Sequence, residues 1–304
     1  EAGKNVFVSP VSVAVALAMT YNGADGETKT AMQETLKLAG LTAEEINESY
    51  KTLLDALLSL DEKVILNIAN SIWYRDDFAV QQDFITLNQN YYDAEVSALD
   101  FADPASLDVI NGWVAKQTNQ KIKEIIKEIS PDHVMFLINA IYFKGAWKYE
   151  FDEAKTSDMP FTLADGTTKQ VKTMGQENDF EILYETDFSA IELPYGRGNY
   201  AMQIFLPKQD KTVDDIIARL TPENWNAWMA NFIQAQGLEL RLPKFRFEYE
   251  KNLNDVLSDM GMRVAFTRYQ ANFSKIANAN LCIDYVKHKS FVEIKKKGTE
   301  AAAA

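Results

Sequence analysis

The sequence has few of the residues that enzymes and metal proteins use for chemistry. Its two histidines are His133 and His288, and its one cysteine is Cys282. Because neither a His-Glu-x-x-His segment nor a cluster of cysteines and histidines occurs, we expect no zinc site and no other metal site. The single cysteine excludes a disulfide bond within the chain.

Sequence motifs of common enzyme classes are also absent. There is no Gly-x-Ser-x-Gly segment, no phosphate-binding glycine loop and no dinucleotide-binding fingerprint. A Ser-His-Asp triad needs only one histidine, so the residue count alone leaves a hydrolase open. His133, however, follows Pro131-Asp132 and is expected in an exposed loop without a catalytic role. The sequence therefore predicts a protein that is not an enzyme and that uses no cofactor.

Basic residues are in deficit along the chain. The sequence has 31 lysines and arginines against 44 aspartates and glutamates, which gives a net charge of −13. Nucleic acids and anionic membranes are polyanions, so neither is expected as a partner. No apolar run approaches the length that spans a bilayer.

The hydrophobic patterns predict an α+β protein with helices early and strands late. Composition is even along residues 1–304, without a Pro- or Ser-rich linker or an internal repeat, which favours a single domain. Ser9-Pro10 is typical of a helix start, with the serine as N-cap and the proline at the first helical position. Further helices are expected at 28–38, 43–60, 106–129, 212–220 and 251–260, and strands at 64–73, 135–147, 168–174, 189–194, 199–206, 237–248 and 281–294.

The last seven residues are a glycine, a threonine, a glutamate and four alanines: Gly298, Thr299, Glu300, Ala301, Ala302, Ala303 and Ala304. One interpretation is a short alanine-rich helix capped by Thr299. The other is a strand of tiny side chains, in which Thr299, Ala301 and Ala303 share one face and can slide between two other strands. Gly298 would then let the backbone reverse direction where that strand begins.

The second interpretation is favoured because this tail resembles the proximal hinge of the reactive loop in inhibitory serpins, a family of serine protease inhibitors. Other segments resemble the same family in the same order along the chain. They are residues 5–12 (Asn-Val-Phe-Val-Ser-Pro-Val-Ser), 111–114 (Asn-Gly-Trp-Val), 139–147 (Asn-Ala-Ile-Tyr-Phe-Lys-Gly-Ala-Trp), 242–245 (Leu-Pro-Lys-Phe), 260–262 (Met-Gly-Met) and 288–293 (His-Lys-Ser-Phe-Val-Glu).

The resemblance implies a fold of three β-sheets (A, B and C) with about eight or nine helices. It also implies that residues 1–304 are a single but partial serpin domain. The start of the first helix, the scissile part of the reactive loop and the C-terminal strands are expected outside this sequence, and the strands would come from a second polypeptide if the loop is cleaved.

The implied function is inhibition by a suicide-substrate mechanism. A target serine protease, or alternatively a cysteine protease, attacks the loop and becomes acylated, and the cleaved loop then inserts into sheet A before the acyl-enzyme is hydrolysed. The runner-up is a non-inhibitory serpin that acts as carrier or chaperone, whose hinge would typically be bulkier or charged. A secreted, extracellular location is expected from the same resemblance.

Five further residues receive roles by resemblance only. Ser9, Ser12, Asn139 and His288 match the "shutter", a buried polar cluster under the point where sheet A opens. Trp147 matches the "breach" tryptophan, near the place where the loop enters.

Two features depart from the family pattern or bear on cofactors. Lys295-Lys296-Lys297 precede Gly298 where the family usually has acidic residues, with an effect on insertion whose sign stays open. Residues 43–62 carry six acidic side chains and one lysine, so we expect no activation by heparin.

Overall fold

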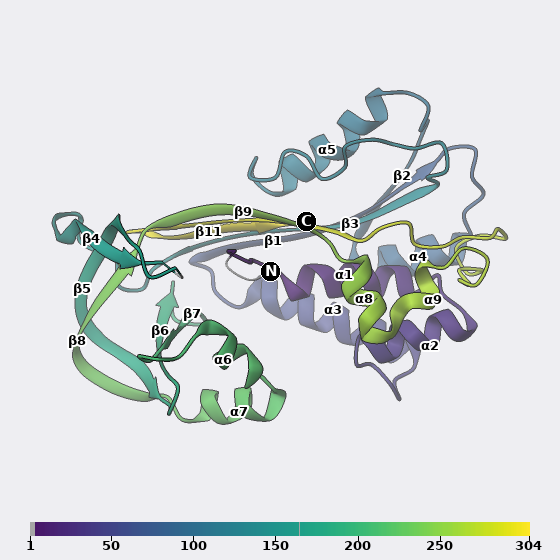
Figure 1. Ribbon diagram of the computed structural model, residues 1–304. Helices are drawn as coiled ribbons and strands as arrows, with labels where there is room; N and C mark the ends of the chain where they lie inside the picture. The colour runs from purple at the N-terminus through teal and green to yellow at the C-terminus, as the bar shows by residue number, and fades with distance from the viewer. Residues whose placement is uncertain (1–3, 164) are drawn as a thin grey trace.

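The computed structural model describes residues 4–163 and 165–304, and a long six-stranded sheet runs through it (Figure 1). The strand order is β2-β1-β3-β11-β10-β9, with β1 and β2 parallel and every other neighbouring pair antiparallel. The strands are β1 (Val64–Arg75), β2 (Ala94–Leu99), β3 (Met135–Ala146), β9 (Phe245–Asn252), β10 (Lys287–Lys295) and β11 (Gly298–Ala303).

The second sheet has five strands. They are β4 (Thr156–Thr162), β5 (Thr168–Tyr184), β6 (Phe188–Tyr195), β7 (Tyr200–Pro207) and β8 (Ile233–Pro243), in the order β4-β5-β6-β7 with β8 paired to β5. The α+β class is confirmed. Sheets B and C were expected to be separate, but their strands form one hydrogen-bonded sheet here because the long β5 joins them. The pairing of β5 with β8 shifts register between Asn178 and Phe180.

Helices lie on both faces of the six-stranded sheet (Figure 1). They are α1 (Pro10–Tyr21), α2 (Gly26–Thr35), α3 (Ala43–Ser59), α4 (Gln82–Tyr92), α5 (Ala105–Gln117), α6 (Val213–Ala218), α7 (Pro222–Ala230), α8 (Asn254–Leu257) and α9 (Arg263–Phe266), with short η1 (Glu153–Lys155) and η2 (Ser258–Met262). In the described residues, no helix has both the length and the apolar character of a membrane span.

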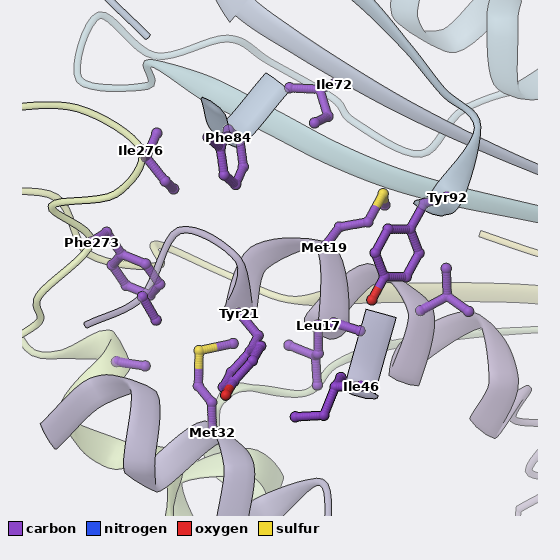
Figure 2. Packing of buried hydrophobic residues seen from close by; sticks show 14 of the residues in the cluster. Leu17, Met19, Tyr21, Met32, Ile46, Ile72, Phe84, Tyr92, Phe273 and Ile276 are labelled. Atoms are coloured by element: carbon purple, nitrogen blue, oxygen red, sulfur yellow. The ribbon is translucent and has the colours of Figure 1, made fainter. Parts of the chain in front are cut away.

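The largest core cluster lies where the early helices meet the sheet. Figure 2 shows Leu17, Met19 and Tyr21 of α1 among side chains from α2, α3, β1 and the segment 273–276. These α1 residues are at most 2% exposed, so α1 is a central helix covered on most sides. Its N-terminus follows the sequence prediction, since Ser9 is the N-cap, its side chain accepts a hydrogen bond from the Ser12 amide, and Pro10 is the first helical residue. The expectation that the chain begins inside an earlier helix falls partly on residues 1–3, which lie outside the described residues.

The helix expected at 106–129 is only half correct. Helix α5 ends at Gln117, and the segment 118–129 crosses the sheet without regular structure. Asn119 and Gln120 have φ of 49° and 62°, which no α-helix accommodates. The apolar spacing arose because Ile122, Ile125 and Ile126 are each buried against the sheet, as side chains of a covering segment rather than of a helix stripe.

Asn111 holds that segment in place. Its side-chain Oδ1 accepts hydrogen bonds from the amides of Ile125 (2.8 Å) and Ile126 (3.1 Å), and its Nδ2 donates to the Ile126 carbonyl (2.8 Å). The Asn111 side chain therefore satisfies backbone groups of residues 125 and 126 that in a helix would be bonded to other backbone groups.

Two more strand boundaries differ from expectation. The run 237–248 is split at Lys244 into β8 and β9, which belong to different sheets. The run 281–294 becomes a strand only from Lys287, because residues 281–286 have no strand partner among the described residues.

Replacing Asn111 by alanine tests its role as a clamp. Three hydrogen bonds to backbone groups disappear and leave buried amides unsatisfied, so the segment should be destabilised by about 2–3 kcal/mol. Hydrogen exchange of the Ile125 and Ile126 amides should accelerate, while the amides of α1 keep their protection. Unchanged exchange at both positions would show that the isoleucines alone hold the segment.

Candidate functional site

Strand β11 lies between β3 and β10 and is hydrogen-bonded to both. Thr299 is paired with Gly145 of β3 and Ile294 of β10, and Ala303 with Ile141 and Ser290. Beyond the strand, Ala304 and Lys289 exchange two backbone hydrogen bonds of 2.7 and 2.6 Å. The tail is therefore an interior strand of a sheet and not a terminal helix.

Both faces of β11 are covered, which explains its small side chains. Ala301 packs in the cluster of Trp147 and Met174, on the side of the second sheet. Ala302 and Ala304 pack in the cluster of α5 and segment 118–129, and are 3% and 7% exposed. The sequence predicted small residues on one face, whereas the structure requires them on both.

Gly298 is needed at the start of the strand. Its φ of 153° and a backbone oxygen of Gly145 that lies 2.0 Å from the site of a Cβ exclude any side chain. The chain therefore passes from β10 into β11 through a turn that only glycine can complete.

Trp147 lies at this turn. Its backbone amide donates to the Lys297 carbonyl (3.1 Å), and its indole Nε1 donates to the Lys295 carbonyl (2.9 Å). The Phe151 amide donates to the Lys296 carbonyl (3.1 Å), and the Trp147 ring stacks on Tyr195 at 4.5 Å. The turn is thus held by three successive carbonyl groups.

Two of the three lysines at the turn keep their ammonium groups near carboxylates. Lys295 pairs with Glu293 (2.8 Å) and Lys296 with Glu153 (3.4 Å). Because the turn is fixed through its carbonyls, this structure accommodates lysine where the family pattern has acidic residues.

Three of the four shutter residues come together at the start of α1. The Ser9 amide donates to Nε2 of His288 (3.1 Å), and Oγ of Ser9 accepts from the Ser12 amide (3.3 Å). His288 is 1% exposed, and its burial lowers its pKa from 6.5 to about 4. His288 is therefore a neutral acceptor that links β10 to the cap of α1.

Asn139 belongs to a different network on β3. Its Nδ2 donates to Oδ1 of Asn70 (2.8 Å), and Nδ2 of Asn70 donates to the Tyr92 carbonyl. Oδ1 of Asn139 is buried without a hydrogen-bond partner among the described residues. The polar pair Asn70-Ser71 interrupts an otherwise apolar strand in the sequence, and this interruption was the only signal for Asn70.

A cavity of about 910 Å³ lies on the continuation of β11. It is lined by residues 135–139 of β3 on one side, by residues 280–288 on the other, and by Ala304 at one end. The strand register puts the position after Ala304 between Asn139 and His288. The space between β3 and β10 is therefore filled by β11 as far as Ala304, and the cavity occupies the space beyond Ala304.

His133 is not in an exposed loop, as expected, but at the edge of this cavity. Its side chain is 12% exposed, packs edge-on against Phe136 and Tyr285, and contacts Asp284 at 3.1 Å. The other ring nitrogen, Nδ1, accepts from the Ser130 amide (3.0 Å), and no serine hydroxyl of the described residues is hydrogen-bonded to the ring.

Sequence reasoning missed the residues that contact the side chains of β11. Tyr195 lies within hydrogen-bonding distance of Oγ1 of Thr299 (2.5 Å), and Tyr142 donates to the Glu300 carboxylate (2.6 Å). Both tyrosines stand in ordinary strand patterns, so only the fold brings them to β11. Among the described residues, no group of three or more His, Cys, Asp or Glu side chains could hold a metal ion.

Comparison with known proteins agrees with this geometry. The family model of serpins, described as serine protease inhibitors, matches residues 1–304, and the chain belongs to the serpin family. Human Serpin B9 is 35% identical over 99% of this chain and 81% of its own length.

Two solved structures have similar folds over nearly the whole chain. The thermophilic serpin tengpin in the latent state has a TM-score of 0.92 and 34% identity over 100% of this chain and 82% of its own. Reactive-loop-cleaved human thyroxine-binding globulin has a TM-score of 0.93 and 29% identity over 99% of this chain and 90% of its own.

The burial of His288 predicts a specific dependence of stability on pH. Its pKa is about 4 in the folded protein, against 6.5 in the unfolded chain. The unfolded chain therefore binds more protons between these values, and the contribution of His288 is complete above pH 6.5 and is lost as the pH falls to 4. Between pH 7 and pH 5 the free energy of unfolding should fall by about 2 kcal/mol through this group.

Denaturant unfolding at the two pH values of wild type, His288→Gln and the control His133→Gln measures this effect. Glutamine can still accept from Ser9 but does not titrate, so His288→Gln should lose that part of the fall, whereas His133→Gln, which leaves His288 in place, should keep it. Equal pH dependence in all three proteins would refute the assignment.

Proposed function

We propose that this serpin is an inhibitor that traps a serine protease as an acyl-enzyme by inserting its cleaved reactive loop into the six-stranded sheet. The observation that carries the proposal is β11, a strand of small residues paired on both sides between β3 and β10. An inhibitor of this kind needs a hinge that the sheet can accept, and Gly298 to Ala304 have the backbone freedom and the small volumes for it.

The cavity extends the proposal to the rest of the loop. In the intact protein, residues after Ala304 would continue β11 through the cavity between β3 and residues 280–288. The first of them would pass between Asn139 and His288. The unpartnered Oδ1 of Asn139 could then accept a hydrogen bond from the incoming strand, which removes a buried polar group that costs free energy.

Insertion explains why the uncut inhibitor must be metastable. Each ladder hydrogen bond contributes about 1 kcal/mol net, and apolar burial of the alanines adds to it. The uncut form would therefore be kinetically trapped above the inserted form. Serpin loop insertion is a known instance of strand addition with release of stored strain.

The polar clusters would control this step without touching the protease. Ser9, Ser12 and His288 fasten β10 to α1, whereas Asn139 fastens β3 to β1. Separation of β3 from β10 leaves both networks intact, which suits the shutter role. Trp147 holds the turn at which insertion begins, which suits the breach role.

Several finer points belong to the same proposal. The target is a serine protease, with cysteine proteases as the alternative class, and heparin is not required. Residues 1–304 act as a single domain completed by C-terminal strands, which a cleaved molecule would keep as a separate fragment. The site of action is extracellular.

Carriage of a small ligand is the second candidate. It is favoured by the similarity to thyroxine-binding globulin, whose name gives its ligand. In that case the loop would be cut by proteases without trapping them.

Incubation of the intact protein with a panel of serine proteases separates the two candidates. An inhibitor should give an SDS-resistant complex at a stoichiometry near one inhibitor per protease, because the acyl bond survives denaturation. Rapid cleavage of the loop with no such complex for any protease in the panel would exclude the inhibitory mechanism.

Ala302→Glu should convert the inhibitor into a substrate. Ala302 lies between Phe291 and Tyr142 and is 3% exposed, so a carboxylate there would be buried during insertion beside the Glu300 carboxylate, which already occupies the nearby donors. We expect the complex to fall at least about tenfold while loop cleavage continues, since a barrier change of 1.4 kcal/mol suffices for that factor. Ala218→Glu, on the exposed surface of α6, is the matched control and should inhibit as wild type does. Full complex formation by Ala302→Glu would contradict insertion along this register.

A further inference from the structure

The carboxylate of Glu300 is bound by three side chains on the face of the sheet that α5 and segment 118–129 cover. Its Oε1 accepts hydrogen bonds from Tyr142 Oη (2.6 Å) and Asn119 Nδ2 (3.4 Å), and its Oε2 pairs with Lys121 Nζ (2.9 Å). The Glu300 side chain is 16% exposed and that of Lys121 24%. The hinge therefore places one charged side chain, Glu300, in a largely buried site, where Lys121 compensates its charge.

The three donors come from the elements that border β11. Tyr142 belongs to β3, and Asn119 and Lys121 belong to the turn after α5. Asn119 Nδ2 also donates to Tyr142 Oη (3.0 Å), and Lys121 Nζ lies 5.2 Å from the centre of the Phe291 ring on β10. The donors are thus tied to β3 and β10 by contacts that do not involve Glu300.

The backbone of the turn is shaped to present these donors. Asn119 and Gln120 both have positive φ, a conformation that costs about 1 kcal/mol or more per non-glycine residue and persists where surrounding contacts enforce it. Asn119 is the residue type that tolerates it best. Thr118 fixes the turn on its other side, since its Oγ1 accepts from the Ile122 amide (3.1 Å).

A carboxylate is the group that fits this position. Burial raises the pKa of Tyr142 to about 12, so its hydroxyl stays a donor. Burial alone would raise the pKa of Glu300, but the hydrogen bond from Tyr142 and the ion pair with Lys121 hold it below its ordinary value. In the strand register Glu300 is flanked by Lys144 of β3 and Glu293 of β10. The carboxylate of Glu293 is itself paired with Lys295.

We propose that Asn119, Lys121 and Tyr142 form a receptor for the Glu300 carboxylate, which captures the hinge early in insertion and commits the loop to the inhibitory branch. This inference rests on the proposed function and adds positioning residues to it. Glu300 is two residues after Gly298, so its capture fixes the register before the alanines enter. The turn at 118–121 then contacts β11 through the same carboxylate, which Asn119 and Lys121 bind.

The test uses the intact protein and the protease with which the wild type forms its complex. Variants Glu300→Gln, Lys121→Met and Tyr142→Phe each remove one part of the receptor. Glu48→Gln is the control, because Glu48 is an exposed glutamate of α3, which is not among the elements that contact Glu300. The measurements are the stoichiometry of inhibition and the rate constant of initial association.

Glu300→Gln and Lys121→Met should raise the stoichiometry of inhibition about tenfold, equivalent to 1.4 kcal/mol in the competition between insertion and release of cleaved loop. Initial association should not change, because the receptor lies away from the scissile bond. Wild-type stoichiometry in Glu300→Gln would overturn the receptor.

A second measurement separates this failure from failure of the proposed function. In the loop-cleaved protein, a double-mutant cycle of Lys121→Met and Glu300→Gln reports their coupling during unfolding without any protease. Coupling near zero would overturn the receptor even if the wild type inhibits. Clear coupling in a wild type that traps no protease would support the receptor in the inserted form and reject only the inhibitory mechanism.

Discussion

The pairing of β11 with two neighbours at once is the interaction on which the molecule depends. A strand at the edge of a sheet uses one side of its backbone, but β11 lies inside and uses both. This demand fixes the chemistry of the tail, because side chains on both faces must fit between a helix-covered layer and a second sheet. It also explains why the hinge is poor in bulky residues and why Gly298 stands where the chain changes direction.

The same constraint organises the surroundings of the strand. The groups around β11 hold it by different means: Trp147 binds the carbonyls of the turn, Tyr195 contacts Thr299, and Tyr142 with Lys121 binds Glu300. Farther along the sheet, His288 ties β10 to the cap of α1 and Asn139 ties β3 to β1. The residues that contact β11 and its turn are thus different from those that fasten the neighbouring strands.

Much of the fold could be predicted from local sequence. Ser9-Pro10 gave the start of α1, and the apolar run at 135–147 gave β3, because capping and strand patterns act over a few residues. The segment 118–129 was mispredicted, since isoleucines that cover a sheet have the same spacing as a helix stripe. Asn111, which holds that segment, gives no local signal because its hydrogen bonds reach 14 and 15 residues along the chain.

Prediction of the site had a similar limit. The hinge residues and Trp147 were singled out because their order resembles a family pattern, and the structure places the former in β11 and Trp147 at the turn before it. The residues that receive the hinge were not found, because contacts such as Tyr142 with Glu300 span 158 residues. Identity of residues along a motif is readable from sequence, whereas complementarity between distant strands requires the fold.

The short turn between β10 and β11 has a consequence for the order of events. Only Lys296 and Lys297 separate the two strands, so the first pair, Lys295 with Gly298, forms across a minimal loop. Every later pair adds next to one already made and closes no larger loop, which keeps the entropic cost of each step small. Pairing of β11 with β10 is therefore expected to begin at the Lys295–Gly298 pair and to extend one residue at a time towards Ala304.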